Sequence, residues 1–153
     1  MSDEHHNSVE LFQFLNKHAS NPDRPHDLYW GMAMMPLYVF GHCEKIIELG
    51  TEMKDTIPQL WSVRVAYCVH FYMALSYLTL HIEKNPTKIG LADGQMQTIL
   101  KHKEVVDFAR FACEANYAMW SLLLEALIFE VKKDYAAAIQ AFEVSSIYIG
   151  ERV

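Results

Sequence analysis

Apolar residues recur at the three- and four-residue spacing of amphipathic helices along most of the chain. This spacing predicts helices over residues 9–20, 27–41, 43–53, 59–83, 93–115, 117–132 and 135–149. Ser8 is the predicted N-cap of the first helix, and Asp93 or a near neighbour that of the fifth. Because the β-branched residues fall inside these helical patterns, we expect no strand. The predicted fold class is all-α, with about seven antiparallel helices joined by short loops.

Proline and glycine mark the breaks between these helices. Residues 21–25 contain two prolines and predict a turn. Pro36 lies inside the second helix, where we expect a kink or an early stop. Residues 87–94 contain two glycines and no sustained periodicity, so they are the predicted long loop. At 153 residues the chain fits a single domain over 1–153, with residues 1–25 as a peripheral helix and linker.

Two segments fit the tetratricopeptide (TPR) repeat template of ~34 residues. The first begins at Trp30 and ends at Pro58. In the second, small residues at Ala126 and Ala138 would let two helices approach closely, while Phe129 fills space beside them. Any antiparallel helical hairpin with an alanine-rich seam would give a similar pattern. The spacing favours a TPR-like stack of helices.

Five runs of the chain resemble the TPR-like segment of very large sensor histidine kinases of fungi and some bacteria. The runs are FGHCEKIIELG (40–50), LWSVR (60–64), HFYMALS (70–76), NY (116–117) and LLLEA (122–126). The resemblance spans residues 30–150 and departs at 118–120, where that family has a histidine. In the family this segment lies between a kinase-like plus NTPase region and a GAF domain. The resemblance implies a cytoplasmic, non-catalytic module for protein–protein or intramolecular contacts in histidine-kinase (two-component) signalling.

The net charge and the longest apolar segment restrict which partners the chain can bind. With 13 Lys and Arg against 19 Asp and Glu, the net charge of −6 argues against nucleic acid and acidic lipid surfaces. Residues 60–82 are the one candidate membrane span, but they contain three tyrosines and two histidines, and we interpret them as a helix buried in the stack. Arg64, their only formal charge, then needs an acidic partner or a place at the edge. Three cysteines in apolar surroundings indicate reduced thiols of a cytoplasmic protein.

The sequence contains no motif for catalysis or cofactor binding. Its glycines do not form a phosphate-binding loop, and no serine lies in a nucleophile elbow, so we expect neither an enzyme nor a cofactor. His42 with Cys43, and Cys68 with His70, lie too close in sequence to share a helix face, so we expect no metal. His102 is the best phosphoacceptor candidate. It lacks the surrounding motif, and we interpret it as part of a solvated helix surface.

Apolar positions facing inward in the two repeats are the candidate partner-binding residues. They form one predicted groove, which would accept a hydrophobic helix or the chain's own neighbouring helix: Met35, Tyr38, Trp120 and Leu127. Ile147 and Ile149 belong to an apolar stripe on the last helix, which predicts a homo-oligomer, or a protein partner or adjoining domain that continues the stack. An alternative function is a sensor that holds a small apolar ligand between the 60–82 helix and its neighbours. An enzyme with an unrecognised site is the third alternative.

Overall fold

The computed structural model describes residues 2–3, 6–60 and 64–150. Within these ranges the chain is helical throughout most of its length, which confirms the all-α class. The α-helices are α1 Ser8–His18, α2 Asp23–Val39, α3 Cys43–Glu52, α4 Arg64–Lys84, α5 Asp93–Ala112, α6 Glu114–Val131 and α7 Tyr135–Gly150. Two short 3-10 helices follow α3, η1 at Met53–Asp55 and η2 at Ile57–Leu60. Contrary to expectation, a two-residue antiparallel strand pair, β1 Ser2–Asp3 and β2 His6–Asn7, precedes α1.

The prolines of α2 interrupt it less than we predicted. The helix begins at Asp23, because Pro22 is its N-cap and Pro25 lies in the first turn, where a missing N–H costs no helical hydrogen bond. It also continues past Pro36 to Val39, so the expected early stop is wrong.

Three other helix starts differ from prediction. Helix α6 begins at Glu114 instead of residue 117. The N-cap of α1 is Asn7 rather than Ser8, and its side chain accepts hydrogen bonds from the N–H groups of Val9 and Glu10. The fourth helix begins at Arg64 instead of residue 59, because residues 57–60 form the 3-10 helix η2. Residues 61–63, which belonged to the predicted helix, lie outside the described residues.

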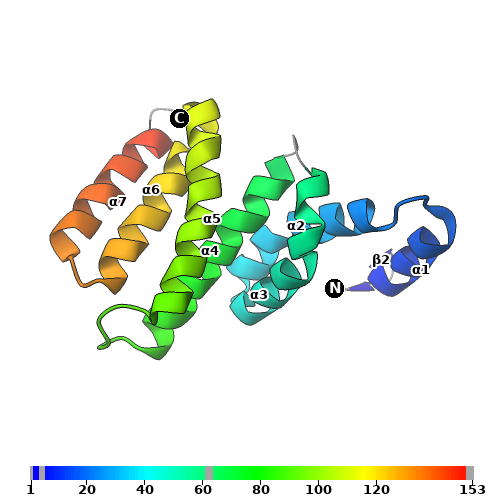
Figure 1. Ribbon diagram of the computed structural model, residues 1–153, viewed down its shortest axis with the longest axis horizontal. Coiled ribbons are helices and arrows are strands. Elements are labelled where there is room, and N and C mark those ends of the chain that lie inside the picture. The colour runs from blue at the N-terminus through cyan, green and yellow to red at the C-terminus, as the bar shows by residue number, and fades with distance from the viewer. Residues whose placement is uncertain (1, 4–5, 61–63, 151–153) are drawn as a thin grey trace.

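Helices α4 and α5 occupy the middle of the molecule, with α2 and α3 on one side and α6 and α7 on the other (Figure 1). Helix α4 contacts α2, α3, α5 and α6, while α7 packs chiefly on α6. At the N-terminal end, the ring of Phe12 on α1 packs against the rings of Tyr29 and Trp30 on α2. Helix α4 therefore packs against helices on both sides of the molecule.

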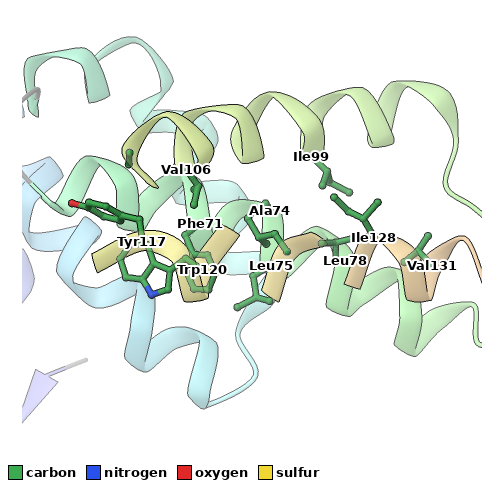
Figure 2. Packing of buried hydrophobic residues seen from close by; sticks show 12 residues of the cluster. Phe71, Ala74, Leu75, Leu78, Ile99, Val106, Tyr117, Trp120, Ile128 and Val131 are labelled. Atoms are coloured by element: carbon green, nitrogen blue, oxygen red, sulfur yellow. The ribbon is translucent and has the colours of Figure 1, made fainter. Parts of the chain in front are cut away.

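Two groups of buried side chains meet on α4. In one, Phe71 stacks on Trp120 of α6 with ring centroids 4.8 Å apart, and the cluster continues through α5 to Val131 (Figure 2). In the other, Met34 of α2 and Ile46 of α3 pack against α4. Burial on both sides explains why α4 is apolar around most of its circumference.

Among the described residues, α4 is the one helix long and apolar enough to cross a membrane, with a mean hydropathy of 1.3. In the fold, 44% of its most apolar window is buried against the other helices. Arg64, its first residue, is exposed, and its guanidinium carbon lies 5.1 Å from the centroid of the Trp120 ring. The predicted placement of this cation at the edge of the stack is therefore confirmed.

Candidate functional site

Two histidines meet at the interface of α4 and α5. His70 lies on α4 and His102 on α5, and their Nδ1 atoms are 2.9 Å apart, with ring centroids at 5.1 Å. One ring therefore donates an N–H to the other, which accepts with its lone pair. His102 was expected on a solvated helix surface. It is half-buried instead, because the packing of α5 on α4 turns it towards His70.

Burial keeps both imidazoles uncharged at neutral pH. It lowers the pKa of His70, and burial together with the nearby His70 lowers the pKa of His102 to about 4. In a neutral pair joined through Nδ1, the donating ring has a bare Nε2 and the accepting ring has an Nε2–H. The pair thus retains one hydrogen-bond acceptor and one donor for other groups.

A pocket of about 410 Å³ adjoins this pair. It lies where η1, η2 and the N-terminal half of α4 face α5, and its described walls are mainly apolar. They consist of Gly50, Lys54, Ile57, Pro58, Ala66, Tyr67, His70, His102 and Val105. Its size falls within the range of small-molecule sites, which are mostly apolar with a few polar groups.

A second, polar cleft of about 470 Å³ lies between α5 and α6. Asp107 accepts a hydrogen bond of 2.6 Å from the hydroxyl of Ser121 and one of 2.7 Å from Nζ of Lys103. Arg110 Nη2 lies 3.7 Å from Oε1 of Glu114. Because both cations are paired with carboxylates, this network serves to join the two helices.

The residues of the predicted partner groove do not share one surface. Met35 is 59% exposed on α2, whereas Trp120 is only 8% exposed and fills the core between Phe71 and Arg64. The hydroxyl of Tyr38 lies 2.9 Å from Oγ1 of Thr79 on α4. Leu127 is half-buried against the α4–α6 cluster. For Trp120, the chain's own neighbouring helix is the occupant, which was the second outcome we anticipated.

The last helix exposes apolar side chains on the face away from α6. Ile147 is 54% exposed, and three further residues of α7 share this exposure: Tyr135, Ile139 and Val144. Ile149 lies within α7, but its side chain is outside the described part of the structure. We call the four exposed residues the α7 face.

Helix α2 carries a second exposed apolar stripe. Met32, Met35, Val39 and Phe40 follow helical spacing and are between 59% and 74% exposed. Met34, between two of them, is fully buried. Of these three methionines, Met34 belongs to the core, whereas Met32 and Met35 lie on the surface. Composition alone does not predict this difference.

Among the described residues, the cysteines and the remaining histidines form no further centre. Cys43, Cys68 and Cys113 are free, and burial raises the pKa of the first two, which favours the less reactive thiol form. In the residues that the structure describes, no three side chains of the metal-binding types come together.

Sequence reasoning missed both the histidine pair and the polar network. His70 and His102 are 32 positions apart, and only the register between two helices brings them together. For the network a signal existed, since Lys103, Asp107 and Arg110 have the spacing of one helix face. Their partner Ser121 could not be found without the packing of α6.

Comparisons with models of protein families, with curated proteins and with solved structures find no match for this chain. The resemblance to the histidine-kinase segment therefore rests on the runs quoted above. Part of one run, residues 61–63, lies outside the described residues.

Proposed function

We propose that the chain is a non-catalytic, TPR-like module that mediates protein–protein or intramolecular contacts in cytoplasmic histidine-kinase signalling. The α7 face is the observation on which the proposal mainly rests. In a stack of helical repeats, each repeat covers the apolar side of the one before it. Helix α7 packs on α6 with one side and leaves four large apolar side chains exposed on the other. A helix of a second copy or of a partner would bury that side.

Small residues at the helix crossings support TPR-like, antiparallel stacking. Ala126 on α6 and Ala138 on α7 are 0% and 4% exposed in the contact between these two helices. Repeat packing needs such small residues where backbones approach each other.

Light scattering over a concentration series tests the proposal. We expect the mass of the wild-type protein to rise with concentration, and Ile139→Glu and Ile147→Glu to shift it towards the monomer, because a buried carboxylate opposes an apolar interface. Gln97→Glu adds the same charge at an exposed position of α5 and is the matched control. A wild type that stays monomeric at every concentration, with no gain in solubility from either α7 variant, would contradict the proposal.

The pocket beside His70 and His102 favours a second function, a sensor for a small apolar ligand. A mainly apolar space of about 410 Å³ next to two uncharged imidazoles is suited to a ligand with one polar group. Native mass spectrometry of freshly purified protein distinguishes the two functions. A retained ligand mass supports the sensor, whereas the bare chain and its multimers support the interaction module.

A further inference from the structure

We propose that the pocket between η1, η2, α4 and α5 binds a small apolar carboxylate, with the carboxylate beside Lys54 and the apolar body inside. The inference rests on the sensor function above and specifies its ligand. The described walls of this pocket combine apolar surface, one cation and a neutral hydrogen-bonding pair.

The walls define the body of the ligand. Ile57, Pro58, Ala66 and Val105 contribute aliphatic surface, and Tyr67 adds an aromatic ring. At about 410 Å³ the pocket is near the lower end of the range for small-molecule sites, so it suits a short chain or a single ring. Burial of each methylene against such walls raises affinity by about 4-fold.

The charges define the head group. Lys54 is the only formal charge among the described residues that line the pocket, and no carboxylate lines it. The ion pairs in the described part of the chain use other cations, namely Lys45, Lys84, Lys103, Arg110 and His26. In a chain of net charge −6, a pocket with one lysine and no acid favours an anion locally.

The histidine pair offers one hydrogen-bond donor and one acceptor, so the preference for an anion over a cation comes from Lys54. Because both rings are neutral, the pair offers an Nε2–H donor, and a carboxylate oxygen can accept it. A divalent metal ion between the same rings would lose much of its hydration without a carboxylate in the pocket to compensate its charge. The chemistry of the pocket therefore favours a carboxylate over a metal ion or an amine.

Three probes of equal chain length test the head group: octanoate, octanol and octylammonium. Isothermal titration at pH 7.5 should give the tightest binding for octanoate, about 10-fold weaker binding for octanol, and none for octylammonium, since one charge-assisted contact corresponds to roughly that factor. Equal affinities for octanoate and octanol would overturn the inference but leave the sensor function intact. The absence of binding by all three probes would overturn both.

Variants locate the site. Lys54→Met keeps an exposed side chain of similar length, and it should lower octanoate affinity to that of octanol without changing octanol binding. Lys88→Met, at an exposed position of the 85–92 loop, is the matched control and should leave both affinities unchanged. Val105→Trp should fill the pocket and abolish both, with circular dichroism to verify folding. An octanoate preference that survives Lys54→Met would overturn the assignment, and this surface variant is informative even if Val105→Trp does not fold.

Discussion

The hydroxyl of Ser121, on α6, donates a hydrogen bond of 2.6 Å to Oδ1 of Asp107, on α5. Ser121 is 1% exposed, so its hydroxyl is removed from water and depends on this acceptor. Lys103 holds the other oxygen of the same carboxylate at 2.7 Å. The three residues thus form a polar link between two helices whose remaining contacts are mainly apolar.

Ser121→Ala should lower the free energy of unfolding by about 1–2 kcal/mol, because a hydrogen bond to a charged acceptor is lost without a large change in volume. Urea denaturation measures the change. Ser146→Ala is the control, since its hydroxyl is exposed and bonds only to the carbonyl of Glu143 within α7; its effect should stay within about 0.5 kcal/mol. Equal effects of the two substitutions would show that the link between the helices contributes nothing.

Gly31→Ala should destabilise the protein. A Cβ on Gly31 of α2 would overlap Cγ1 of Val65 on α4, and valine has little freedom at χ1 to move away. The overpacking costs about 1–3 kcal/mol, which exceeds the helix-propensity gain of about 1 kcal/mol. At Gly94, in the first turn of α5, no atom lies within 4 Å of the added Cβ, so Gly94→Ala should be neutral or stabilising. Thermal melting measures the stability of both variants. An unchanged Tm for Gly31→Ala would contradict close packing of α2 on α4.

Ala138→Leu should destabilise the α6–α7 pair by about 1–3 kcal/mol, because the added carbons force the two helices apart. Ala138 is 4% exposed, whereas Ala136, two positions earlier, is exposed. Ala136→Leu therefore serves as the control and should change stability by no more than about 0.5 kcal/mol. If the two variants melt at the same temperature, the repeat register assigned to α7 is wrong.

The helices were predictable from sequence because their signals are local. Spacing of apolar residues located all seven α-helices in the described ranges, and Lys133 and Asp134, which were expected to join the last two, lie in that connection. The errors arose where a position within the helix mattered more than residue type. Pro25 lies in a first turn, where an absent N–H is tolerated. Pro36 lacks the N–H that would bond to the carbonyl of Met32, and the helix ends three residues later, at Val39.

The candidate site was less predictable, because it depends on which helix faces meet. No spacing along the chain relates His70 to His102, or Ser121 to Asp107, before the register of α4, α5 and α6 is known. For Trp120, the sequence predicted a binding role that the packing of the helices does not support. Its apolar ring fits a binding groove and a core equally well, and the neighbouring Phe71 places it in the core.

Acid should weaken the fold through His102, whose pKa is lowered to about 4 in the folded protein by burial and by His70. In the unfolded chain an imidazole has a pKa of about 6.5, so between these values the unfolded state binds more protons. The contribution of His102 is therefore fully present above pH ~6.5 and is lost as the pH falls towards about 4. We expect a loss of about 1–3 kcal/mol over this range from this group.

His102→Gln isolates that contribution, since glutamine remains polar but does not titrate. Urea unfolding at pH 7.5, 6.5, 5.5 and 4.5 should show a steeper decline for the wild-type protein than for the variant, and the carboxylates, which titrate in both proteins, cancel in the difference. His42→Gln replaces an exposed histidine and should retain the wild-type slope. If wild type and His102→Gln lose stability in parallel, His102 is not held neutral by its surroundings, and the pair with His70 accepts a proton as readily as imidazole in water.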